Sequence, residues 1–132
     1  MFGKKKQPPI KSLIAAGTEI HGDVVFSDGL RVDGQINGNL QAPAEAPSLL
    51  VISEAATVRG EVRAGHVIIN GCVVGPVQSD QLLELQPKAR ITGDVRYETL
   101  EMHQGATIDG ELRAFKTSDE RPALKLAASS RL

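Results

Sequence analysis

A five-residue unit repeats along this chain: an aliphatic residue, any residue, glycine, any residue and a second aliphatic residue. Successive glycines of the unit are 16, 22, 15, 18 and 17 residues apart, so the period is near 17 except in one long interval. That interval contains an insert at residues 41–48, whose two prolines predict a loop. A fixed period of this length is typical of solenoid proteins. The six copies start at Ile20, Ile36, Val58, Val73, Ile91 and Ile108.

The alternation of aliphatic and polar residues predicts strands, because the side chains of a strand alternate with a period of two. Glycine is poor in a central strand but suits a sharp corner, since it tolerates positive φ and has no side chain. Three short strands joined by such corners use about 17 residues and close one turn. We therefore predict an all-β fold, a single-stranded parallel β-helix of about six turns with a triangular section. The predicted corner glycines are Gly22, Gly34, Gly38, Gly60, Gly71, Gly75, Gly93 and Gly110.

The composition restricts what can fill the interior of this solenoid. Only three Phe, one Tyr and no Trp are present, so the core must consist of aliphatic side chains and alanine. Ala56, Ala89 and Ala106 each lie two residues before a repeat unit, and we expect them to stack as a narrow column at one corner.

The net charge of −1 hides an uneven distribution. Residues 1–11 carry four Lys and no acidic residue, whereas residues 12–115 carry seven basic and fourteen acidic residues. An acidic body disfavours nucleic acid as a partner, and a basic arm is attracted to anionic surfaces. We interpret residues 1–12 as a flexible arm that binds an anionic membrane, where each Lys contributes about 1 kcal/mol. The expected membrane-binding residues are Met1, Phe2, Lys4, Lys5 and Lys6.

Several features favour a cytoplasmic location at the inner face of the membrane. The single cysteine, Cys72, excludes an internal disulfide framework. No apolar run approaches the roughly 18 residues that would span a bilayer, and prolines and a lysine interrupt any N-terminal signal sequence. We expect the β-helical domain to cover residues 13–115 and to be followed by a disordered polar tail at residues 116–132.

The repeated unit, its spacing and the layout of the two tails resemble the bactofilins, bacterial cytoskeletal proteins. The likeness covers about residues 13–115, and the Met1-Phe2 and lysine arm is similar to the membrane-targeting N-terminus of the family. It implies a right-handed β-helix that polymerises without nucleotide into non-polar filaments. It also implies a scaffold for cell-shape or cell-wall proteins, whose identity stays open. The insert at residues 41–48 departs from the regular pattern.

The ends of a β-helix expose backbone hydrogen-bonding groups and apolar side chains unless a cap covers them. The sequence offers no capping helix before Leu13, so we expect the ends to stack on further copies of the chain. If like ends pair, head to head and tail to tail, two different two-fold contacts generate a non-polar filament. The expected interface residues are Leu13, Ile14, Ile20 and Val24 at one end, and Leu100, Met102, Ile108, Leu112 and Phe115 at the other.

The chemical alternatives find little support, and we expect no catalytic residue and no cofactor. A left-handed β-helix acyltransferase would place glycine directly after the aliphatic residue, whereas one residue intervenes here. His21, His66 and His103 are not expected to converge on a metal, and no glycine precedes Lys-Ser or Lys-Thr as in a phosphate loop. A discrete adaptor that binds a partner protein remains an alternative to the filament.

Overall fold

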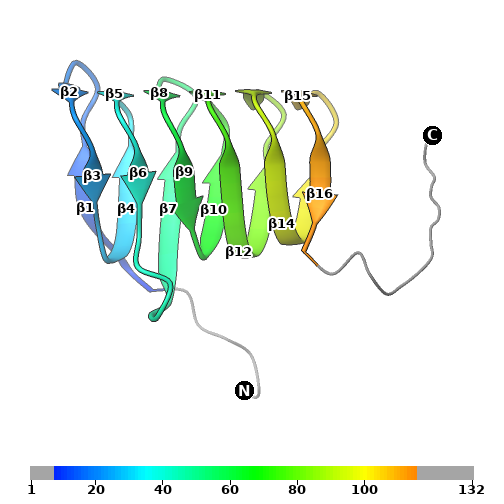
Figure 1. Cartoon of the computed structure of the whole chain (residues 1–132). Helices are drawn as coiled ribbons and strands as arrows, with labels where there is room; N and C mark the ends of the chain where they lie inside the picture. Colours follow the sequence, from blue (N-terminus) through cyan, green and yellow to red (C-terminus); the bar gives the residue numbers. More distant parts are fainter. Residues whose placement is uncertain (1–7, 116–132) are drawn as a thin grey trace.

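The structure, a computed structural model, describes residues 8–115. The expected membrane-binding residues Met1, Phe2, Lys4, Lys5 and Lys6, and the tail at residues 116–132, lie outside the described residues. Within residues 8–115 there are sixteen strands and no helix. The strands stack as the six turns of a β-solenoid, which confirms the predicted all-β fold (Figure 1).

Each turn contributes strands to three faces, and every pairing between neighbouring turns is parallel. Face 1 comprises β1 (Ile10–Ile14), β4 (Asp28–Val32), β7 (Ser48–Ile52), β10 (His66–Ile69), and the later parts of β12 (Val77–Leu85) and β14 (Val95–Met102). Face 2 comprises β2 (Glu19–His21), β5 (Gln35–Asn37), β8 (Thr57–Arg59), β11 (Cys72–Val74), β13 (Arg90–Thr92) and β15 (Thr107–Asp109). Face 3 comprises β3 (Val24–Val25), β6 (Leu40–Gln41), β9 (Val62–Ala64), the early parts of β12 and β14, and β16 (Leu112–Ala114).

The repeat units stack in register. Their first aliphatic residues form one column on face 2: Ile20, Ile36, Val58, Val73, Ile91 and Ile108. Their second aliphatic residues form another on face 3: Val24, Leu40, Val62, Val77, Val95 and Leu112. Because neighbouring turns place the same kind of side chain at the same position, the core is a set of apolar columns along the axis.

Burial is complete in the middle of each column. In the face 2 column the four central residues are at most 2% exposed, whereas Ile20 and Ile108 in the outermost turns are only partly buried. The corner alanines Ala56 and Ala89 are 2% and 0% exposed. A core residue is therefore fully buried only when a neighbouring turn covers it on each side. The outermost turns lack one of these neighbours.

Glycines fill the corner between face 2 and face 3. A Cβ atom added to Gly60 would lie 2.1 Å from the carbonyl oxygen of Gly38, and one added to Gly38 would lie 2.1 Å from that of Gly22. The same close approach continues up the stack through Gly75, Gly93 and Gly110. Backbone here occupies the space of a side chain, so only glycine allows successive turns to approach this closely.

At the second corner, between face 1 and face 2, each of the two shorter turns has a single glycine that packs against the preceding turn. Gly34 would direct a Cβ to 2.5 Å from the carbonyl oxygen of Thr18, and Gly71 to 2.2 Å from that of Ser53. In the longer turns this corner is instead closed by a tight turn, such as the one in which the Ala56 N–H donates to the Ser53 carbonyl at 3.0 Å. The two kinds of turn therefore reach the same cross-section with different numbers of residues.

The solenoid begins earlier than the sequence boundary at residue 13. Strand β1 starts at Ile10, which pairs with Gly29, and Lys11 forms an ion pair with Asp28 at 3.3 Å. The two prolines before Ile10 have no N–H to donate, so the ladder starts directly after them. The expected insert forms the connection between β6 and β7, which extends beyond the stack in Figure 1.

The glycine column predicts a position-dependent cost for alanine. Gly60 has a φ of 154° and Gly22 a φ of 133°, so alanine is strained at both positions. Only at Gly60 would the added Cβ also clash, with Gly38, because the space around Gly22 is open. We expect Gly60→Ala to lower the free energy of unfolding of the unassembled chain by about 3 kcal/mol or more, and Gly22→Ala by about 1 kcal/mol. Denaturant titration followed by circular dichroism measures both. Equal losses in the two variants would contradict the clash.

Candidate assembly surfaces at the two end turns

The first and last turns of the solenoid each have a neighbour on one side only. In the N-terminal end turn (residues 10–25), β1, β2 and β3 pair only with the next turn. In the C-terminal end turn (residues 99–114), β15 and β16 likewise pair only with the preceding turn. No further strand or helix within residues 8–115 covers either end. The outer edges therefore present backbone donors and acceptors that an added strand can bind.

At the N-terminal end, three of the four expected interface residues belong to the interior columns. Ile14, Ile20 and Val24 pack against the core but are only partly buried, because no turn precedes them. Leu13 differs: its register partner is the exposed Arg31, so its side chain lies on the outer surface of face 1 and is 58% exposed. The outward direction of Leu13 follows from the inward direction of Ile14, because adjacent residues of a strand face opposite sides.

At the C-terminal end, four expected interface residues continue the interior columns. Leu100 and Ile108 are partly buried against the core, while Met102 and Leu112 are 44% and 43% exposed. This end turn thus presents apolar side chains on all three faces without a covering turn.

Phe115 lies beside the last turn. Its N–H donates to the Tyr97 carbonyl at 2.8 Å, which extends the face 3 ladder by one residue. The guanidinium carbon of Arg96 is 5.0 Å from the centre of the Phe115 ring, a cation–π distance. Because Arg96 is an exposed side chain of face 3, the ring packs toward the outer surface and leaves the apolar columns open.

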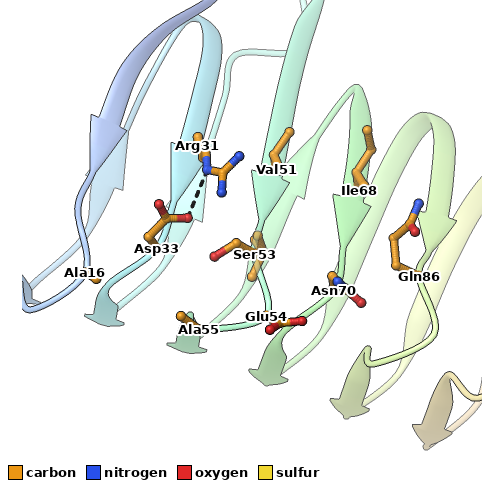
Figure 2. A pocket seen from close by; sticks show the side chains of 11 residues that line it. Ala16, Arg31, Asp33, Val51, Ser53, Glu54, Ala55, Ile68, Asn70 and Gln86 are labelled. Atoms are coloured by element: carbon orange, nitrogen blue, oxygen red, sulfur yellow. Dashed lines mark hydrogen bonds and ion pairs between the residues drawn. The ribbon is translucent and has the colours of Figure 1, made fainter.

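A shallow groove of about 530 Å³ runs along face 1 and its corner with face 2. Figure 2 shows Arg31, Val51 and Ile68 projecting from successive strands along this groove. Arg31 donates to the Asp33 carboxylate at 3.0 Å. A hydrogen bond from Ser53, assisted by Arg31, lowers the pKa of Asp33 below its usual value. Arg31 and Asp33 at this groove are therefore held in mutual contact.

The three histidines lie in different turns and do not meet. His21 pairs with Glu19 at 3.5 Å in the first turn, and His103 lies beside Glu84 and Glu101 at the other end. His66 is 9% exposed in the fourth turn, and its burial lowers its pKa although Glu84 and Glu101 oppose that shift. The juxtaposition of His103 with two carboxylates was not expected from the sequence. The repeat period does predict that Glu84 and Glu101 are neighbours, because they occupy equivalent positions 17 residues apart.

No helix in the described part of the chain is long and apolar enough to cross a membrane.

Comparison with known proteins identifies the family. A family model described as "Bactofilin: Polymer-forming cytoskeletal" matches residues 12–113, which is most of the chain and coincides with the six-turn solenoid. No curated protein and no solved structure matches the chain. The chain belongs to the bactofilin family of polymer-forming cytoskeletal proteins.

Proposed function

We propose that this cytoskeletal protein assembles end to end, without nucleotide, into non-polar filaments that act as a membrane-associated scaffold for cell-shape or cell-wall proteins. The observation that carries the proposal is the incomplete burial of the apolar columns in both end turns. A further turn placed on either end would extend the columns and pair with the open strand edges, and at a two-fold junction the paired strands run antiparallel. The description of the family as polymer-forming supports self-association.

Apolar burial at such a junction favours assembly. Fully burying a Val, Leu, Ile or Met side chain contributes about 1.5–3 kcal/mol, so completing the burial of a half-exposed one contributes about 1 kcal/mol. Each end offers several of these side chains, and a two-fold junction buries both copies of the set. Backbone hydrogen bonds along three strands also stabilise the junction. The entropy lost on association opposes it.

The arrangement of the subunits follows from which ends pair. If each end pairs with its own kind, the filament has two different two-fold junctions and no polarity. Blocking one junction of such a filament leaves a dimer, because the other junction still forms. Blocking one end of a head-to-tail filament leaves monomers, because every contact needs both kinds of end.

Leu112→Glu therefore tests both the junction and its symmetry. We expect this variant to form dimers joined at their N-terminal ends, because the new carboxylate opposes burial of the C-terminal end turn. Val74→Glu is the matched control, since Val74 is also 43% exposed but lies in a central turn, on face 2. Sedimentation velocity separates the species.

The outcomes of this experiment are distinct. Polymer formation by Leu112→Glu equal to that of Val74→Glu would show that the C-terminal end turn is not a junction. Monomers in place of dimers would contradict the pairing of like ends. A wild-type chain that stays small and discrete would favour the adaptor over the filament.

Membrane attachment is assigned to the basic residues before the solenoid. Three lysines at about 1 kcal/mol each would hold a single chain weakly on an anionic surface. Many arms on one filament would bind together far more tightly, because linked weak sites act through effective concentration. Lys11 stands apart from this group, since it lies in β1 and pairs with Asp28.

Flotation on phosphatidylglycerol vesicles tests the arm without interference from sedimenting filaments. We expect replacement of Lys4, Lys5 and Lys6 by Gln to abolish flotation while leaving assembly unchanged, because it removes three positive charges outside the solenoid. Lys11→Gln is the control and should float as the wild type does. Undiminished flotation of the triple variant would overturn the assignment of membrane binding to these lysines.

A further inference from the structure

The C-terminal end turn and the turn before it bring two carboxylates and an imidazole together on the outside of face 1. Glu84 and Glu101 are register partners in β12 and β14, so their side chains lie one above the other. His103 follows β14 directly, and its Nε2 lies 3.6 Å from a Glu84 carboxylate oxygen and 3.8 Å from one of Glu101. The three ligand atoms all lie within 4.8 Å of one another.

The charges of this group are unbalanced when the imidazole is neutral. Like charges directly opposite one another on neighbouring strands are destabilising, and Glu84 is largely shielded, with 22% of its side chain exposed. Three positive side chains of the same two turns are engaged elsewhere: Lys88 pairs with Glu54 at 3.1 Å, Arg113 pairs with Glu111 at 2.6 Å, and Arg96 contacts the Phe115 ring. A cation between the two carboxylates would remove this repulsion.

The geometry at Nε2 favours a metal ion over a hydrogen bond. This atom is shielded from solvent and has no hydrogen-bond partner within residues 8–115, and its two carboxylate neighbours lie beyond hydrogen-bond distance. Two ligands about 2.1 Å from a tetrahedral ion lie about 3.4 Å apart, close to the two distances from the His103 Nε2 to the carboxylate oxygens. Gln86 donates to the same Glu84 oxygen and fixes the orientation of that carboxylate, as partners of ligating carboxylates do.

We propose that Glu84, Glu101 and His103 form a binding site for a divalent transition-metal ion, with Zn²⁺ as the best-fitting ion. One imidazole nitrogen and two carboxylate oxygens are ligand types that Zn²⁺ accepts, whereas Mg²⁺ and Ca²⁺ prefer oxygen ligands alone. The ligands come from consecutive turns, so the ion clips the last turn to the one before it. That turn has no neighbour on its far side, and it gains most from such a clip. The site does not depend on filament formation.

Equilibrium dialysis of the full chain against Zn²⁺, with bound metal measured by mass spectrometry, tests the site in assembled or unassembled protein. We expect one ion per chain, binding at least tenfold weaker in His103→Gln and in Glu101→Gln, and a Zn²⁺-dependent rise in the unfolding midpoint that both variants lose. These side chains are 40% and 57% exposed, so the fold should tolerate both changes.

The control is His21→Gln, which removes an imidazole that also faces a glutamate, but only one. This variant should bind Zn²⁺ as the wild type does. Unchanged affinity in His103→Gln, or a loss of the bound ion in His21→Gln, would overturn the proposal. Absence of stoichiometric binding to the wild type would do the same and would leave a proton as the group that balances the two carboxylates.

Discussion

The close approach of successive turns is the constraint on which this structure depends. Parallel strands lie about 4.8 Å apart, so each turn must follow the path of the turn before it at every corner. At the glycine corner that path leaves no room for a Cβ atom, because the carbonyl oxygen of the preceding turn occupies its place. The same constraint explains the composition: a narrow interior accepts aliphatic side chains and alanine in columns but has little space for aromatic rings.

The same geometry leaves the ends unfinished. A turn in the middle of the stack is covered from two sides, and its core residues are buried without further help. The end turns have the same residue types in the same columns but a neighbouring turn on one side only, so the proposed end-to-end assembly would extend the contacts that already hold the monomer together. In this account the polymer needs no specialised binding element and no nucleotide, since the exposed edges and columns are complementary to more of the same fold. The proposed metal clip fits this view, because it reinforces the turn that the fold itself supports least.

Much of this architecture was readable from the sequence, for a physical reason. The aliphatic residues of the six repeat units, taken from the sequence alone, stand in unbroken register in the structure, because a stacked fold converts sequence period directly into spatial alignment. Features that depend on strand partners or on the path of a single corner were harder to predict from the sequence. The start of β1 at Ile10 depends on a partner strand eighteen or so residues away, and the outward direction of Leu13 depends on the phase of that strand. His103 approaches Glu84 and Glu101 because of how one corner is closed, which a motif search for paired histidines does not detect.

Electron cryomicroscopy of the assembled full-length chain would show how neighbouring subunits meet. Six turns at about 4.8 Å give a subunit length of about 29 Å, and a non-polar filament repeats after two subunits, at about 58 Å. We expect a continuous β-solenoid with this two-subunit repeat, in which like ends meet and the turn spacing continues across both junctions. Filaments with a one-subunit repeat of uniform direction, or subunits joined side by side through the faces of the solenoid, would contradict it.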